Sequence, residues 1–306
     1  MKQIREAVIL ITGATDGLGR AVALELAKSG ASLLLHGRDR ERAESVLREI
    51  RRVTGDGRAR YYLADFSSLH QVRALAEEIK TDHERLDVLV NNAGIGAGER
   101  GGSQRALSRD GHELRFAVNY LSHFLLTRSL LPLLRHSAPA RIINVVSAAQ
   151  SPIDFDDVML EQSYDGMRAY AQSKLAQVMF TFDLAEELEG TGVTANCLHP
   201  ASLMPTKLVL EYFGNSMSTL EEGVDATVRL ASSPELEAFS GRYFDGQREA
   251  RANARAYERD ARDALRQLSE QLTEPIGQAE ERLPWSGTPL RGALHPRPPT
   301  SSDQGG

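Results

Sequence analysis

Short apolar segments alternate with longer segments of helical period along most of the chain. Two of these segments, residues 7–12 and 141–146, are almost continuously apolar, which is typical of strands covered on both faces. The pattern predicts seven β-strands, at residues 7–12, 32–36, 60–64, 86–91, 141–146, 193–198 and 242–244.

The segments between these strands carry apolar side chains at helical spacing. Residues 40–53 and 69–80 each gather them into one stripe, and Thr219 with Glu222 forms a capping box before the helical run 224–231. A late helix has its apolar positions at Tyr257, Ala261, Ala264, Leu265, Leu268 and Leu272. Because strands alternate with helices, we expect an α/β fold: a doubly wound (Rossmann) seven-stranded parallel sheet in a single domain.

The composition changes near the end of the chain. Six of the twelve prolines fall in the last 32 residues, between glycines and serines. Such segments bury too little apolar surface to fold alone. We therefore expect a domain over residues 1–272 and a mostly disordered tail over residues 273–306. Trp285 in this tail could dock on the domain or on a partner.

Charge and residue usage exclude several classes of protein. The net charge is −6 and no basic stripe appears, so nucleic acid is not an expected partner. The single cysteine, Cys197, excludes an internal disulfide framework and a multi-cysteine zinc site, and the histidines show no metal-ligand spacing. No apolar run reaches the ~20 residues of a membrane span, and residues 7–11 are too short for a signal core. We expect a cytoplasmic protein without a metal.

A glycine-rich turn joins the first predicted strand to the first helix. Gly13 can adopt backbone angles that other residues resist, and side chains at Gly17 and Gly19 would block a phosphate or the contact between helix and strand. The helix N-terminus offers free N–H groups to a pyrophosphate. We expect dinucleotide binding by Gly13, Thr15, Asp16, Gly17, Leu18 and Gly19.

The spacing Thr12-Gly13-x-x-x-Gly17-x-Gly19 resembles that of the short-chain dehydrogenase/reductase family. Further motifs of that family follow in order over residues 5–272: Asp65-Phe66, Asn91-Asn92-Ala93-Gly94, Asn119, Ser147, Tyr170-x-x-x-Lys174 and His199-Pro200. The residues around Tyr170 and the long interval from Ser147 are most similar to the retinol-dehydrogenase-like branch. Ala201 departs from the family's usual glycine after Pro200.

The resemblance also implies cofactor contacts and a cofactor preference. Gly37 stands where the family's NAD-users carry an acidic residue, and Arg38 stands one position beyond. Because a guanidinium can pair with a 2′-phosphate, we expect NADP over NAD, with a solvated Arg38 as the alternative. By resemblance, further cofactor contacts come from Asp65, Phe66, Asn92, Ala93, Gly94, Tyr170, Lys174, Pro200 and Thr206.

Four residues form the expected catalytic set. Tyr170 serves as acid and base, and Lys174, four residues on, shares its helix face and moves the pKa of the phenol toward neutrality. Ser147 follows a parallel strand, where such sheets open a crevice, and can hold the substrate oxygen. Asn119 could tether a water that relays protons through Lys174.

These residues predict an NADP-dependent oxidoreductase that interconverts a carbonyl and an alcohol. The alternatives are a catalytically silent NADP-binding regulator or scaffold, and a C=C reductase of the same family. Apolar residues in segments 148–167 and 202–217 favour a lipophilic small-molecule substrate, and the alternative is that they pack this lid on its own domain or on another subunit. By resemblance, the helices expected at 111–135 and 170–189 pair between subunits, which predicts a homo-oligomer.

Overall fold

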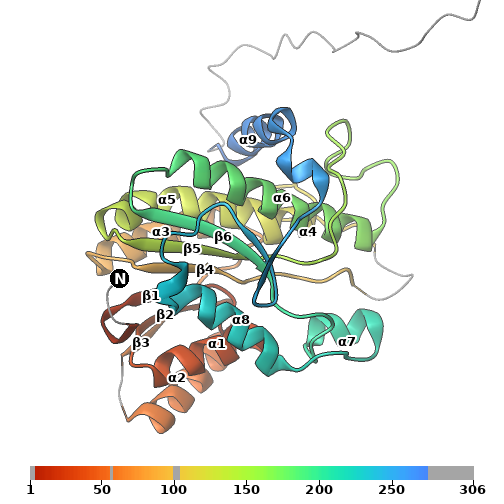
Figure 1. Cartoon of the computed structure of the whole chain (residues 1–306). Helices are drawn as coiled ribbons and strands as arrows, with labels where there is room; N and C mark the ends of the chain where they lie inside the picture. The colour runs from red at the N-terminus through yellow and green to blue at the C-terminus, as the bar shows by residue number, and fades with distance from the viewer. Residues whose placement is uncertain (1–3, 56–57, 99–103, 275–306) are drawn as a thin grey trace, which may run out of the picture. The chain divides into compact units, whose positions relative to one another are not determined.

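A single mostly parallel sheet organises the chain (Figure 1). The computed structural model describes residues 4–55, 58–98 and 104–274. Eight strands are hydrogen-bonded in the order β3-β2-β1-β4-β5-β6-β7-β8. Their bounds are β1 (Val8–Ile11), β2 (Ser32–Gly37), β3 (Ala59–Leu63), β4 (Val88–Asn91), β5 (Ala140–Val145), β6 (Val193–His199), β7 (Tyr243–Asp245) and β8 (Arg248–Ala250).

The seven predicted strands are confirmed, and one was missed. Strand β8 pairs antiparallel with β7, whereas every other pair in the sheet is parallel. Its three residues, Arg248–Ala250, carry two charged side chains and no apolar pattern. A short edge strand of this kind has no periodicity to recognise, because it buries no face.

Helices cover both faces of the sheet and mostly match their predicted positions. On one face lie α1 (Gly17–Lys28), α2 (Arg40–Thr54) and α8 (Leu220–Ser232), and their apolar residues form one core cluster with the strands. The predicted capping box of Thr219 and Glu222 begins α8. The outer face of α2 is strongly polar, so its single stripe is enough to pack it.

The opposite face is covered by α3 (Leu69–Asp82), α5 (Ser122–His136) and α6 (Gly166–Glu187), which build the second cluster. The helix expected at 111–135 is interrupted: α4 (Leu114–Phe116) passes through a π-helical turn, Ala117–Leu121, into α5. The late helix is α9 (Arg259–Thr273), and it lies over α5 and α6 on their side away from the sheet (Figure 1).

Smaller elements complete the description. Helix α7 (Lys207–Phe213) follows β6, and single helical turns lie at Ile4–Glu6, Pro234–Leu236 and Ala254–Tyr257. The chain divides into the units Met1–Thr273 and Glu274–Gly306. Residues 275–306 lie outside the described residues, so the expected tail and the role of Trp285 stay predictions. In the described part, no helix is long and apolar enough to cross a bilayer.

Candidate active site

The glycine turn after β1 depends on the absence of side chains. Gly13 and Gly17 have φ of +65° and +51°, where glycine is favoured. A Cβ on Gly13 would lie 2.8 Å from Ala93 Cα, and one on Gly19 would lie 2.3 Å from the Gly13 carbonyl oxygen. Helix α1 begins at Gly17, so the turn presents the amides of a helix N-terminus, which suit a dinucleotide's phosphates.

The other predicted residues of this turn hold its shape. Asp16 caps α1 by accepting a hydrogen bond from Gly17 N at 2.8 Å, while Leu18 is buried in the core below. Thr15 packs where a Cβ on Gly37 would stand, only 2.5 Å from Thr15 Cγ2. Gly37 therefore brings the end of β2 against the turn, next to Arg38.

The segment Asn92–Gly94, after strand β4, is hydrogen-bonded to the glycine turn and lies beside the candidate catalytic residues. Asn92 donates from Nδ2 to the carbonyl oxygen of Thr12 at 2.8 Å. The Thr12 hydroxyl in turn accepts from the amides of Asn92 and Ala93, each at 2.9 Å. A Cβ on Gly94 would lie 3.2 Å from Asn119 Oδ1 and 3.8 Å from Lys174 Nζ. The motif expected to contact cofactor is thus adjacent to the expected catalytic set.

The predicted adenosine contacts differ in their exposure. Arg38 is exposed after β2. Burial acts to raise the pKa of the nearby Asp65, but hydrogen bonds from Ser67, with smaller contributions from the charges of Arg109 and Arg38, lower this pKa overall. The ring of Phe66 is buried and stacks on His36 with centroids 4.1 Å apart. Its ring packs inside the protein, so a cofactor contact would come from its main chain.

Two predicted contacts follow β6. Pro200 is buried directly after the strand, and Thr206 stands at the start of α7. Thr206 faces the glycine turn, because its Cγ2 would lie 3.6 Å from a Cβ on Gly17. The chain between them therefore returns to the glycine turn, and the expected cofactor contact of Thr206 stays a prediction.

Tyr170 lies on α6 within hydrogen-bond reach of Ser147. The side chain of Asp165 caps this helix by accepting from Arg168 N at 2.7 Å, which sets the start of the helix one turn before Tyr170. Ser147 follows β5, and its hydroxyl accepts from Ala149 N at 3.1 Å. Burial raises the pKa of Tyr170, and the hydrogen bond with Ser147 lowers it in part.

Lys174 is buried one helical turn further along α6. Its ammonium donates to the carbonyl oxygen of Val145 at 3.0 Å and to Gln177 Oε1 at 2.8 Å. Nζ lies 5.9 Å from the centre of the Tyr170 ring. Burial lowers the pKa of Lys174 to about 7, so it is only partly charged at neutral pH. The net effect of the surroundings on Tyr170 is a raised pKa, with burial as the largest cause, and not the lowering expected from Lys174.

Asn119 lies inside the π-helical turn and is fully buried. Its Oδ1 accepts from Ile95 N at 2.8 Å, while Nδ2 donates to the Ile95 carbonyl oxygen and to Ser173 Oγ. The side chain therefore cross-links the segment after β4 to α6. Its expected role as a water tether stays a prediction, because most of its hydrogen-bonding capacity is already used.

Two buried residues beside this set were not predicted from the sequence. Gln177 accepts the hydrogen bond from Lys174, and its Nε2 lies 3.0 Å from Nδ1 of His123 on α5. The available signal was spacing: Gln177 is three residues after Lys174, and His123 is four after Asn119, so each shares a helix face with a candidate residue. Cys197 is buried in β6, as a structural thiol would be.

Fold and site together define a class of protein: a doubly wound dinucleotide-binding protein with a Ser-Tyr-Lys centre at the carboxyl edge of its sheet. In such sheets, ligands bind where the strand order reverses. Here the reversal lies between β1 and β4. The glycine turn follows β1, and the segment Asn92–Gly94 follows β4.

Comparison with known proteins identifies the family. A model of the short chain dehydrogenase family matches residues 7–213. Retinol dehydrogenase 14 of Homo sapiens is 40% identical over 289 residues, covering 86% of this chain and 84% of that protein. Retinol dehydrogenase 13 of Mus musculus is 37% identical over 306 residues, covering 94% and 88%. The chain belongs to the short chain dehydrogenase family, in its retinol-dehydrogenase-like branch.

Solved structures agree with this assignment. An uncharacterized protein from Mycobacterium paratuberculosis is 30% identical with a TM-score of 0.72, and the match covers 88% of this chain and 93% of that one. A short chain dehydrogenase from Shigella flexneri 2a, solved in complex with NADP, is 26% identical with a TM-score of 0.67, covering 81% and 100%. The resemblance inferred from the motifs is therefore confirmed at the level of family and fold.

Proposed function

We propose that this protein is an NADP-dependent oxidoreductase that interconverts a carbonyl and an alcohol on a lipophilic small molecule, with Tyr170 as acid and base. The observation that carries the proposal is the interaction of the Ser147 and Tyr170 side chains, with Lys174 one helical turn away. A phenol beside a substrate oxygen can deliver a proton to an alkoxide or remove one from an alcohol.

The residues would divide the reaction as follows. Ser147 holds the substrate oxygen by a hydrogen bond, and Tyr170 gives its proton to that oxygen in reduction or takes it in oxidation. When bound, the nicotinamide cofactor supplies or accepts the hydride. Lys174 contributes positive charge near the phenol, which favours the tyrosinate. Because burial lowers the pKa of Lys174 to about 7, this contribution depends on the groups that accept hydrogen bonds from the Lys174 ammonium.

Three observations support NADP as the cofactor. Arg38 is exposed beyond β2, with Gly37 before it in place of an acidic residue. The Shigella flexneri neighbour is solved with NADP, and a neighbour from Escherichia coli CFT073, 26% identical with a TM-score of 0.67, is solved with NADPH. The glycine turn supplies the close approach that a pyrophosphate needs.

The lipophilic substrate is supported by the two segments beside the site and by the relatives named retinol dehydrogenases. Part of the apolar set is in the core: Ile153, Val158, Leu160 and Met204 are buried. Phe155, Leu210, Phe213 and Met217 are exposed instead. Leu160 and Leu203 both have φ of +50°, an unusual strain for leucine that is often found at functional sites.

Cellular location and assembly stay predictions. A cytoplasmic location rests on the sequence alone. The expected homo-oligomer was to form through the long helices that became α5 and α6. Helix α9 packs on α6 of the same chain.

Tyr170→Phe tests the proposed function. We expect turnover of lipophilic alcohols and carbonyls to fall by about 10²–10⁴-fold, because the acid/base proton is lost, while NADPH still binds. Absorbance of the reduced cofactor follows turnover, and fluorescence titration follows binding. Near-normal turnover in the variant would remove Tyr170 from this role. Cofactor binding without turnover by the wild type on a broad panel would favour a silent regulator, and a saturated product would favour C=C reduction.

A further inference from the structure

A buried polar chain begins at Lys174 and leads away from the substrate side. The ammonium has two acceptors, the Val145 carbonyl oxygen and Gln177 Oε1, and the shorter contact is to Gln177 at 2.8 Å. Gln177 is almost completely buried, with 1% of its surface exposed. A buried amide that contacts an ammonium contributes a charge-assisted hydrogen bond in a region without competing water.

The far end of Gln177 faces a fixed imidazole. His123 Nδ1 lies 3.0 Å from Gln177 Nε2 and 2.9 Å from the carbonyl oxygen of Asn119. The other ring nitrogen lies 3.3 Å from the Thr12 hydroxyl. Phe66 packs edge-on against the same ring, with centroids 5.5 Å apart. A single ring nitrogen cannot accept from Gln177 and donate to Asn119 at once. In the tautomer that holds Gln177, with the ring proton on Nε2 facing the Thr12 hydroxyl, Nδ1 accepts from Gln177 Nε2 and thereby directs the amide oxygen toward Lys174.

We propose that Gln177, held by His123, is a positioning residue that fixes the Lys174 ammonium below Tyr170. The inference rests on the proposed function, because it assigns Lys174 a task in the chemistry of Tyr170. It adds a specific claim: the main-chain acceptor at Val145 is not sufficient, and the amide oxygen of Gln177 is needed to keep the lysine both charged and in place.

The consequence has a definite direction. Burial already lowers the pKa of Lys174, so losing an acceptor favours the neutral amine further. A neutral Lys174 does less to stabilise the tyrosinate, and the pKa of Tyr170 then rises. Within the described residues, the titratable groups that interact with Lys174 are Tyr170 on α6 and His123 on α5; His123 is itself kept neutral near pH 7, because burial lowers its pKa to about 3. A positive charge on His123 therefore does not contribute to the expected shift of the pH profile.

Gln177→Leu is the test, and Gln172→Leu is its matched control. Both glutamines lie on α6 and are 1% exposed. Gln172 bonds elsewhere: Nε2 donates to the Val158 carbonyl oxygen at 2.9 Å, and Oε1 accepts from Asp154 N at 3.1 Å. The measurement is the pH profile of kcat and of kcat/KM for alcohol oxidation with NADP, on the full-length chain.

For Gln177→Leu we expect the rising limb of the profile to move up by about one pH unit, which is about a tenfold loss at a pH on that limb. The loss should fall on kcat. Gln172→Leu should raise KM, because it loosens the segment at Asp154 and Val158, and should leave the limb in place.

Other outcomes would overturn the proposal. If Gln177→Leu keeps the wild-type limb, or if both leucine variants shift it equally, Gln177 has only a packing role. The Tyr170→Phe result separates the two levels: an active Tyr170→Phe enzyme refutes the proposed function, while an inactive one with an unshifted Gln177→Leu limb refutes only the positioning role.

Discussion

The two faces of the sheet are packed by different kinds of side chain. The face under α1, α2 and α8 is lined mainly by aliphatic side chains, and its outer helices turn polar residues outward. The face under α3, α5 and α6 also buries Asn119, His123, Lys174 and Gln177. The second face thus carries the polar groups of the candidate site inside its core, where they need partners on every side.

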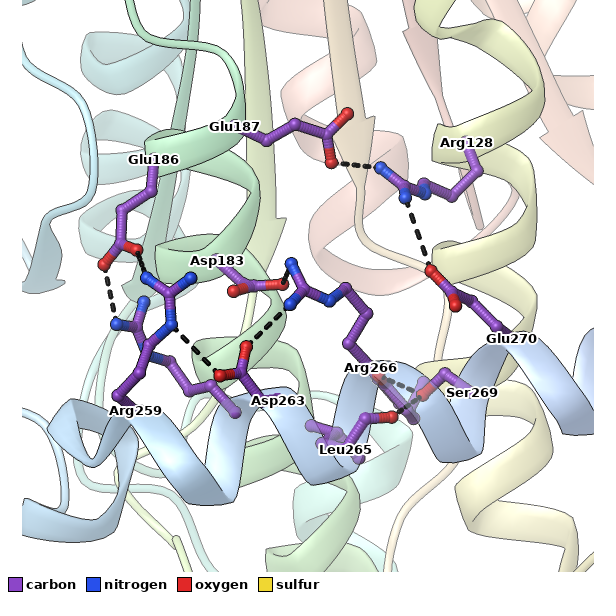
Figure 2. A network of polar contacts seen from close by, with 12 residues as sticks. Arg128, Asp183, Glu186, Glu187, Arg259, Asp263, Leu265, Arg266, Ser269 and Glu270 are labelled. Carbon is purple, nitrogen blue, oxygen red and sulfur yellow. Dashed lines mark hydrogen bonds and ion pairs between the residues drawn. The ribbon is translucent and has the colours of Figure 1, made fainter. Parts of the chain in front are cut away.

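The second face has an additional outer layer. Sixteen of the 22 residues of α6 are buried, which leaves little of that helix polar and exposed. Figure 2 shows α9 lying across it, with Arg259 reaching Glu186 and Arg266 reaching Asp183. The buried hydroxyls of Ser269, on α9, and Tyr120 lie 2.6 Å apart, and Tyr120 directly follows Asn119 in the sequence. A helix of the same chain therefore packs on one of the two helices that, by resemblance, are expected to pair between subunits.

Removing α9 should have the largest effect on stability, because among the described residues α9 packs only on the face under α3, α5 and α6. A chain ending after Glu258 loses Leu265 from the core, along with the partly buried Leu268 and Leu272. We expect the free energy of unfolding to fall by about 5 kcal/mol or more, since each large apolar side chain contributes about 1.5–3 kcal/mol. The uncovered apolar surface of α5 and α6 should then cause self-association. Urea denaturation and light scattering after size exclusion measure both effects.

The control is a chain ending after Glu274, which retains every described contact of α9. It should unfold at the wild-type urea concentration and elute unchanged. Leu265→Ala offers a milder version, expected to cost about 2–5 kcal/mol without removing the helix. A shorter chain that stays monomeric and equally stable would show that α9 does not protect this face.

Acid should distinguish the faces next. His36 and His123 are both buried against the ring of Phe66, and burial lowers their pKa values to about 4 and about 3. Unfolded histidine titrates near 6.5. Because the unfolded chain binds protons first, stability is complete above about pH 6.5 and falls as the pH drops toward 4. At pH 5 each histidine should account for about 2 kcal/mol of lost stability.

Urea midpoints at pH 7 and pH 5 measure this loss. In His36→Gln the difference between the two pH values should shrink, although the variant is also less stable at pH 7, since His36 Nε2 lies 3.0 Å from the Ala64 carbonyl oxygen. The exposed His70→Gln should keep the full difference. An unchanged difference in His36→Gln would mean that acid acts through other groups.

The same contrast explains what could be predicted from the sequence. Strands β1 and β5, the helix stripes and the glycine turn depend on neighbours in the chain, so their periodicity and spacing were informative. The motifs around Ser147 and Tyr170 gave the family for the same reason. On the face under α1, α2 and α8, one stripe per helix was sufficient information.

What could not be predicted depends on contacts between distant segments. The docking of α9 on α6 joins residues far apart in the sequence, such as Glu186 and Arg262, which are 76 positions apart, and nothing local distinguishes it from a contact between subunits. The same holds for His123 and Gln177, which are 54 residues apart. Phe66 was assigned to the cofactor by its motif, but its ring is buried because His36 and His123 both pack on it.

The smallest expected effect concerns the edge where the two faces meet and the cofactor would lie. Arg38→Ala should reduce the preference for NADPH over NADH by about 10–100-fold in kcat/KM, because a hydrogen bond to a charged group contributes about 1.5–3 kcal/mol. Steady-state rates with each cofactor give the ratio. Arg40 is the matched control: it is exposed two residues later, but its guanidinium donates to the Tyr61 hydroxyl at 2.6 Å. Arg40→Ala should keep the ratio. An equal fall in both variants would mean that general positive charge, not a specific 2′-phosphate contact, selects the cofactor.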